Sequence, residues 1–242
     1  MRALTAAEII RLWETAYRFH AIDQALSILQ LVMPEQSRDD LAALPLGQRD
    51  ALLLSLRQVT FGDLLPGKSH CPQCGETVEF ELSCRTLVSN VGRAQQIHMT
   101  RDAYQISIRP LNSFDLAAAA GADSLQEAHD LLMRACVAEA CYQGQTIAPQ
   151  TLPPEIKKDI AAMAEAADPQ AEILLTLNCP ACGQQWQSVL DVASILGQEI
   201  TARAQRLLLE VHLLAKAYGW VEAEILNLSP TRRATYLQMV TP

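Results

Sequence analysis

Two short cysteine motifs carry the clearest chemistry in this sequence. Cys71 and Cys74 lie in the segment Cys-Pro-Gln-Cys-Gly, and Cys179 and Cys182 lie in the segment Cys-Pro-Ala-Cys-Gly. Two thiolates spaced in this way can bind one metal ion from one side, and the following glycine can adopt the positive φ that turns backbone N–H groups toward the sulfurs. Two such pairs supply the four thiolates of a closed structural zinc site. We therefore expect one structural zinc ion bound by these four cysteines.

Two other uses of paired cysteines stay open at this point. A redox Cys-x-x-Cys motif usually occurs once, at a strand-to-helix junction, whereas these two pairs lie beside segments of extended character at 78–82, 173–177 and 186–190. Disulfides need an oxidising compartment, and the first residues resemble a helix start rather than an export signal. These arguments favour zinc and predict a cytoplasmic protein. The long separation of the pairs indicates that the metal fastens a whole domain.

Catalytic motifs are missing from the sequence. It contains no H-E-x-x-H, G-x-S-x-G, phosphate-binding loop or G-x-G-x-x-G pattern. His70 adjoins Cys71 and could be a spare metal ligand, but a loop role is expected because four thiolates already complete a tetrahedron. Such a closed site has no open position at which to activate water. We therefore expect no enzyme and no small-molecule substrate.

The composition and net charge of the chain limit the kinds of partner that it can bind. The chain has 242 residues, of which half are hydrophobic, and carries a net charge of −8. An acidic chain binds nucleic acid poorly, because phosphate contacts need clustered Lys and Arg. No apolar run approaches the length of a membrane span. The sequence therefore predicts a protein that works with neither nucleic acid nor membrane.

Hydrophobic spacing predicts a mainly helical chain. A capping box formed by Thr5 and Glu8 opens the first helix. Further helices are expected at 22–32, 38–44, 48–59, 113–120, 124–142, 155–167, 191–218 and 222–226, and from residue 230 onward. Leu125 is expected to point inward, and the Pro66-Gly67 pair marks a loop. Strands are expected at 76–82 and 104–109 and beside the second cysteine pair.

These elements predict an α+β protein, mainly helical, with a small zinc-ribbon-like β module closed by the two cysteine motifs. The predicted regions are an N-terminal helical region at 1–66, the zinc-ribbon module with inserted strand and helices at 67–190, and a C-terminal helical region at 191–242, together forming one compact unit. The remaining cysteines are expected to be small buried hydrophobic residues, namely Cys84, Cys136 and Cys141.

The C-terminal segment resembles a known family. It reads LLLEVHLLAKAYGW at 207–220, EAEIL at 222–226 and SPTRRATYL at 229–237. This pattern is similar to the end of the T-even-phage baseplate hub assembly protein family, which also occurs in phage-derived contractile injection systems. The segments EIIRLWE at 8–14, ALPLGQRD at 43–50 and both cysteine motifs are similar too. One departure is Val221, where the family often has the Ser or Thr that caps the next helix.

The resemblance implies a non-enzymatic assembly factor, either a chaperone or a minor structural component, for the hub or spike of a contractile-tail baseplate. Its partners would be hub, spike or other tail proteins, met in the cytoplasm where particles assemble, and the protein could also be retained in the particle. We expect the partner-facing surface at Trp220, Glu224, Arg232, Arg233 and Tyr236.

Two alternatives accompany this expectation. Trp220 and Tyr236 could instead fill the core, and the Arg232-Arg233 pair could form a solvated or salt-bridged helix face. The rival function is a zinc-ribbon protein that binds nucleic acid or acts in transcription, which the acidic charge disfavours.

Overall fold

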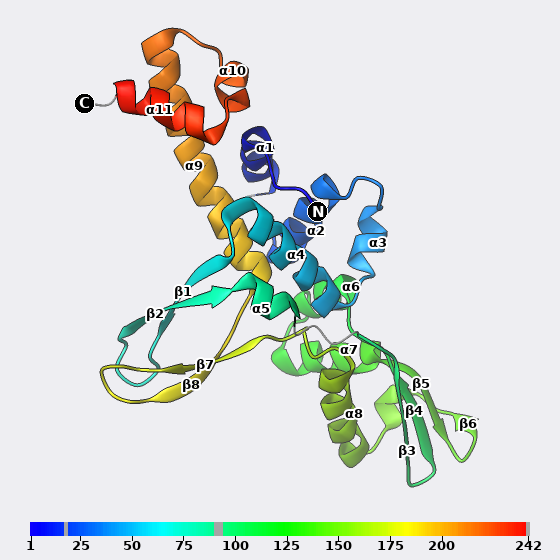
Figure 1. Cartoon of the computed structure of the whole chain (residues 1–242). Coiled ribbons are helices and arrows are strands. Elements are labelled where there is room, and N and C mark those ends of the chain that lie inside the picture. The colour runs from blue at the N-terminus through cyan, green and yellow to red at the C-terminus, as the bar shows by residue number, and fades with distance from the viewer. Residues whose placement is uncertain (17–18, 90–93, 241–242) are drawn as a thin grey trace.

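The computed structural model describes residues 1–16, 19–89 and 94–240 of the chain. Figure 1 shows a helical body, two long β-hairpins that project from it, and a four-stranded sheet with its own helices. The strands of the described residues form three small antiparallel sheets. The predicted mixture of helix with a little sheet is therefore confirmed.

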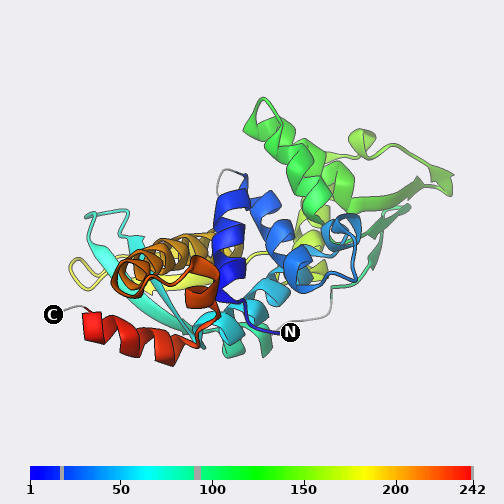
Figure 2. The same cartoon turned by 90° about the horizontal axis from the view of Figure 1, so that it is seen from above.

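The helical body is built from amphipathic helices that pack against the long helix α9 (Val192–Tyr218). Figure 2 shows α1 (Ala6–Ala16) lying against α9. The predicted capping box opens α1, because the N–H of Glu8 donates to Thr5 Oγ1 at 3.2 Å and the N–H of Thr5 donates to Glu8 Oε2 at 2.8 Å. The body also contains α2 (Ala21–Val32), α3 (Arg38–Ala42) and α4 (Leu46–Phe61). Its most enclosed side chains include Leu29, Leu41, Leu53, Leu54, Leu56 and Leu207.

The two hairpins lie side by side below this body in Figure 1. The first pairs β1 (Leu64–His70) with β2 (Thr77–Ser83), and the short helix α5 (Cys84–Ser89) follows it directly. The second pairs β7 (Leu174–Asn178) with β8 (Gln185–Val189), which leads directly into α9. Each cysteine motif forms the tip of one hairpin. The strands predicted around the motifs are thus confirmed.

The four-stranded sheet has the strand order β3 (Ile97–Arg101), β4 (Tyr104–Ile108), β5 (Val137–Tyr142) and β6 (Gln145–Thr146). Helices α7 (Leu125–Cys136) and α8 (Pro154–Ala167) pack against it, and α6 (Ser113–Ala120) precedes α7. A separate core forms here, from Ile106, Ile108, Met133, Cys136, Leu152, Ile156 and Ile160. This part of the chain therefore buries its own apolar side chains apart from the helical body.

The chain ends in two short helices, α10 (Glu222–Asn227) and α11 (Pro230–Val240). They fold back beside the last turns of α9 (Figure 1), which ends before Gly219 as predicted. We call residues 208–240 the C-terminal lobe. No helix in the described ranges is both long and apolar enough to span a membrane.

Three predictions about local structure are wrong. The helix expected at 124–142 ends at Cys136, because Val137–Tyr142 form backbone hydrogen bonds with β4 and become β5. Leu125, expected inside, is 88% exposed at the first position of α7. The loop expected at Pro66-Gly67 is the middle of β1. The boundaries of the three predicted regions stay predictions.

Candidate metal centre

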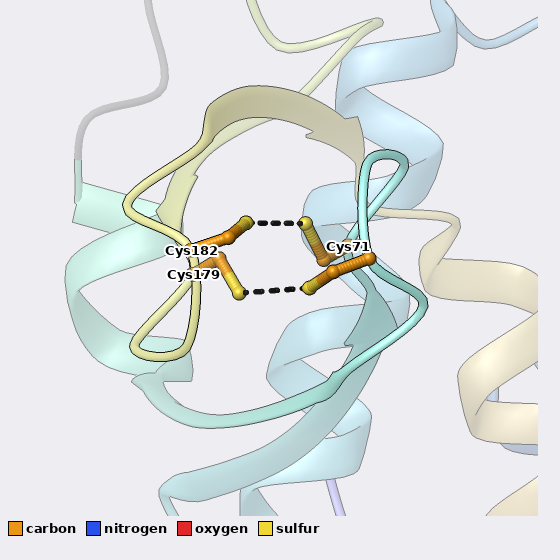
Figure 3. Close-up of side chains that lie close together, drawn as sticks. Cys71, Cys179 and Cys182 are labelled. Carbon is orange, nitrogen blue, oxygen red and sulfur yellow. Dashed lines mark hydrogen bonds between the residues drawn. The ribbon is translucent and has the colours of Figure 1, made fainter.

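The four motif cysteines meet between the tips of the two hairpins. Their sulfurs all lie within 4.8 Å of one another. The Sγ atoms of Cys71 and Cys182 are 3.6 Å apart, and so are those of Cys74 and Cys179. Figure 3 shows the sulfurs of the two motifs facing one another across a small central space. With Zn–S bonds of about 2.3 Å, a tetrahedron has sulfur–sulfur edges of about 3.8 Å, so the arrangement fits a tetrahedral metal ion.

The first motif is shaped by a tight backbone turn between β1 and β2. The N–H of Gly75 donates to the carbonyl of Cys71 at 2.9 Å, and the N–H of Cys71 donates to the carbonyl of Glu76 at 2.9 Å. Gly75 has φ of 75°, a left-handed conformation that glycine adopts without strain. The turn therefore places both sulfurs of the motif on one side of the hairpin tip.

The second motif repeats this turn between β7 and β8. The N–H of Gly183 donates to the carbonyl of Cys179 at 3.0 Å, the N–H of Cys179 donates to the carbonyl of Gln184 at 2.8 Å, and Gly183 has φ of 74°. In each motif the first cysteine is buried and the second is exposed. Two half-sites of the same construction thus face each other, as the shared sequence pattern predicts.

The distances exclude disulfides among these four residues. A disulfide requires sulfur atoms about 2.05 Å apart, whereas Cys71 and Cys182, and likewise Cys74 and Cys179, have sulfurs 3.6 Å apart. All seven cysteines of the chain are free thiols. Cys84 and Cys136 are buried, as predicted, while Cys141 is only half-buried. The four motif cysteines therefore remain available as metal ligands.

The protonation chemistry of the cluster favours a bound cation. Burial acts to raise the pKa of Cys71, but backbone N–H groups of Cys74 and Gln73 outweigh it and bring this pKa to about 7. At Cys74 the N–H of Glu76 acts to lower the pKa, yet the thiols of Cys182 and Cys179 raise it to about 12. The Cys71 thiol therefore ionises readily, whereas the neighbouring thiols oppose ionisation of Cys74. Four thiolates can coexist here when a metal cation lies between them.

The bases of the hairpins are fixed by a buried arginine that the sequence analysis did not identify. Arg57 on α4 is 2% exposed and donates to Glu199 on α9 through Nη2 at 2.7 Å and Nε at 3.0 Å. Its Nη1 donates to the carbonyl of Gly62, where the first hairpin begins, at 2.7 Å. The same atom lies 3.7 Å from the sulfur of Cys84, where that hairpin ends. Arg57 thereby connects α4, which precedes the first hairpin, to α9, which follows the second hairpin.

His70 lies next to the cluster without joining it. Its Nδ1 is 3.3 Å from the hydroxyl of Thr77, the residue opposite it in the hairpin. Among the described residues, the group that could hold a metal ion contains the four cysteines and no histidine. His70 is therefore outside the cluster, but it is the last residue of β1 and not the loop residue that was expected.

The five residues expected to face a partner occupy different environments in the C-terminal lobe. Trp220 and Tyr236 are half-buried, and their rings meet edge to face with centroids 5.0 Å apart. Arg232 is exposed. Glu224 is exposed too, and it accepts a hydrogen bond at 3.2 Å from the N–H of Val221, whose own side chain can offer no cap to α10.

Arg233 differs from the other four residues because it is 2% exposed. Its Nε donates to Glu210 on α9 at 2.6 Å. Its Nη1 donates to the carbonyl of Leu228 at 3.3 Å. Arg233 therefore holds α11 against α9 and is buried, whereas the other four residues are exposed or half-buried.

Comparison with known proteins identifies one family. The family model described as T4 bacteriophage base plate protein matches residues 18–197, which are 180 of the 242 residues. The matched range contains both cysteine motifs, Arg57 and the first residues of α9, from Val192 to Gly197. It ends before the C-terminal lobe. No curated protein and no solved structure matches the chain.

Proposed function

The chain belongs to the T4 bacteriophage base plate protein family, and we propose on this premise that it is a non-enzymatic assembly factor for the hub or spike of a contractile-tail baseplate. The observation that carries this proposal is the family match over most of the chain. The protein would hold or place hub subunits during assembly, as a chaperone or as a minor component of the finished particle.

One zinc ion bound by Cys71, Cys74, Cys179 and Cys182 would complete the fold of this factor. Four thiolates occupy every position of a tetrahedral ion, so the metal would have a structural role and would activate no water. The ion would join two hairpins that are about 100 residues apart in sequence, and a cross-link over a loop of that length restricts the unfolded chain strongly. The metal therefore supports a rigid scaffold rather than a reaction.

The C-terminal lobe is the surface proposed to face the partner. It exposes four large apolar side chains, with exposed fractions of 58% at Leu209, 38% at Tyr218, 61% at Val221 and 68% at Met239. Exposed apolar side chains gathered on one part of a protein are characteristic of interaction sites. Trp220, Tyr236 and Arg232 belong to the same lobe, and aromatic and arginine side chains are enriched at interfaces.

Co-expression with the neighbouring hub and spike subunits, followed by pull-down and by analysis of purified particles, tests the proposal. A chaperone is captured with a hub subunit and is absent from the particle. A structural component is captured and is also present in the particle. Capture of neither subunit would contradict an assembly role and favour the rival zinc-ribbon protein that binds nucleic acid.

A pair of variants tests the surface. Trp220→Ala should abolish capture while the far-UV circular dichroism and the melting temperature stay close to those of the wild type. Phe114→Ala is the matched control, because Phe114 is an aromatic residue on α6, outside the lobe, with 49% of its surface exposed. Loss of capture only together with loss of the fold would show that Trp220 serves the core.

A further inference from the structure

A groove of about 380 Å³ lies where the N-terminal segment, the end of α4 and the C-terminal lobe meet. Figure 1 shows α10 beside α1 and α9 in this region. The walls are about equally apolar and polar, and the apolar part includes Leu4, Ile9, Phe61 and Leu226. Among the described residues, the charged side chains that line the groove are two arginines, Arg203 on α9 and Arg233 on α11.

Both arginines share one carboxylate. Arg203 Nη1 lies 3.2 Å from Glu210 Oε1, and Arg233 Nε lies 2.6 Å from Glu210 Oε2. The side chains of Arg203, Glu210 and Arg233 are 28%, 14% and 3% exposed. Two guanidinium groups with one carboxylate leave one positive charge uncompensated in a largely buried cluster. A buried charge is unfavourable unless it is paired.

The described part of the chain supplies no second anion for this cluster. Glu8, near the groove at the start of α1, is already bound by both terminal nitrogens of Arg2 and by the N–H and hydroxyl of Thr5. Within the described residues, Nε and Nη2 of Arg203 and Nη2 of Arg233 have no hydrogen-bond acceptor. The groove therefore combines apolar side chains with guanidinium N–H groups that remain free to donate.

We propose that this groove binds a short acidic segment of a partner protein. A carboxylate of the segment accepts hydrogen bonds from Arg203 and Arg233, and a neighbouring apolar side chain packs against Leu4, Phe61 and Leu226. Guanidinium groups suit this ligand because their planar N–H pairs match a carboxylate in two-point hydrogen bonding. The site is separate from the four cysteines, and the proposal holds whichever assembly the partner belongs to.

Two matched peptides test the proposal directly. The probes are N-acetylated, C-amidated Leu-Glu-Leu and Leu-Gln-Leu, which differ in one charge. Binding to the metal-loaded full chain is followed by NMR through the arginine Nε–H signals. The Glu peptide should bind about fivefold or more tightly than the Gln peptide, because hydrogen bonds to ionised groups are the stronger ones. The preference should shrink as salt is raised.

Arg203→Gln should remove the preference for the Glu peptide. Arg206→Gln should keep it, because Arg206 is an exposed arginine on the same helix outside the groove lining. Equal binding of both peptides, or an unchanged preference in Arg203→Gln, would overturn the proposal. The proposal would also be overturned if neither peptide bound and the protein formed a dimer that Arg203→Gln converted to monomer. The groove would then be occupied by a second copy of this chain. The peptide experiment tests the groove, and the pull-down with hub subunits tests the assembly role. A negative result in one experiment therefore leaves the other claim standing.

Discussion

Arg57 and Glu199 are 142 residues apart in the sequence and form a two-point ion pair that joins α4 to α9. The side chain of Arg57 is 3% exposed and that of Glu199 is 24% exposed. Since α4 runs into the first hairpin and β8 runs into α9, this pair sets the bases of the two hairpins whose tips carry the cysteines. The two hairpins are therefore brought together at both ends, at the four cysteines of their tips and at this ion pair near their bases.

Replacing Arg57 with Met should lower the free energy of unfolding by about 2–3 kcal/mol. The change leaves the Glu199 carboxylate and the Gly62 carbonyl without their donor, and removing one partner of a buried pair is strongly destabilising. Glu199 keeps some contact with water, so the expected loss is below the roughly 3–5 kcal/mol of fully buried pairs. Urea unfolding of the metal-loaded protein measures it.

The control for this prediction is Lys68→Met. Lys68 forms an ion pair with Glu79 at 2.6 Å on the first hairpin, but both side chains are about 70% exposed. Exposed pairs contribute little to stability, so no measurable change is expected. Equal losses in the two variants would contradict a special role for Arg57.

The four-cysteine cluster could be predicted from the sequence because the geometry of each half is local. Each Cys-Pro-x-Cys-Gly segment closes its own turn, and the two turns repeat the same hydrogen bonds. The ends of most helices were predictable for the same reason, since caps such as Thr5 with Glu8 act within one turn. The Arg57–Glu199 pair was not predictable, because a single charge in a leucine-rich helix does not indicate its distant partner.

The missed strand β1 has a clear physical cause. Proline and glycine usually mark turns, yet Gly67 lies opposite Phe80 in the hairpin. A Cβ atom at Gly67 would lie 2.2 Å from the Phe80 ring, so this glycine makes room for a neighbouring side chain. The strand β5 was missed because Val137, Ala140 and Cys141 also fit a helix, and only pairing with β4 decides their conformation.

Removal of the metal should destabilise the whole protein. Chelation, or the substitution Cys179→Ser, should lower the free energy of unfolding by about 5 kcal/mol, the value expected in the chain-entropy model for releasing a cross-link over about 100 residues. Elemental analysis should give one zinc ion per chain, and X-ray absorption should show four sulfur ligands at about 2.3 Å. Thermal melting with and without chelator measures the loss.

Cys141→Ser is the control for the metal experiment. Cys141 is a half-buried cysteine in β5, outside the four-sulfur cluster. This variant should keep its full zinc content and should lose stability on chelation as the wild type does. Unchanged melting of the wild type after chelation, and of Cys179→Ser, would contradict a structural metal.

Gly47→Ala should be strongly destabilising although Gly47 lies in a helix, where alanine is normally the better residue. An added Cβ would lie 2.2 Å from Asp168 Oδ1 and 2.6 Å from the Cβ of Gln170. The close approach lets the N–H of Gly47 donate to Asp168 Oδ2 at 2.9 Å. We expect a loss of about 1–3 kcal/mol from overpacking, measured by urea unfolding.

Gly121→Ala is the matched control for that substitution. The nearest atom to an added Cβ at Gly121 is a backbone oxygen at 3.6 Å, and φ there is −86°. Alanine fits this conformation, so stability should stay the same or rise slightly because the unfolded chain becomes less flexible. A loss at Gly121→Ala as large as that at Gly47→Ala would contradict the steric explanation.

Asp168→Asn should stabilise the protein at neutral pH but not in acid. Asp168 is 4% exposed, and its Oδ1 has no hydrogen-bond partner among the described residues. Burial raises the pKa of Asp168, against which the N–H groups of Gly47 and Gln170 act only in part. Between the ordinary pKa and this raised value the folded chain binds more protons than the unfolded chain, so this group's contribution to stability falls as pH rises. Asparagine keeps an acceptor for Gly47 without the buried charge.

The gain in Asp168→Asn should therefore be near zero below the ordinary aspartate pKa of about 4 and reach about 1 kcal/mol at neutral pH. Urea unfolding of the wild type and the variant at several pH values measures the difference. Asp123→Asn, at an exposed position before α7, is the control, and no gain in stability is expected at neutral pH because no buried charge is removed there. A gain in Asp168→Asn that is already complete in acid would show that the charge of Asp168 is not its cause, because the carboxyl group is neutral in both states there.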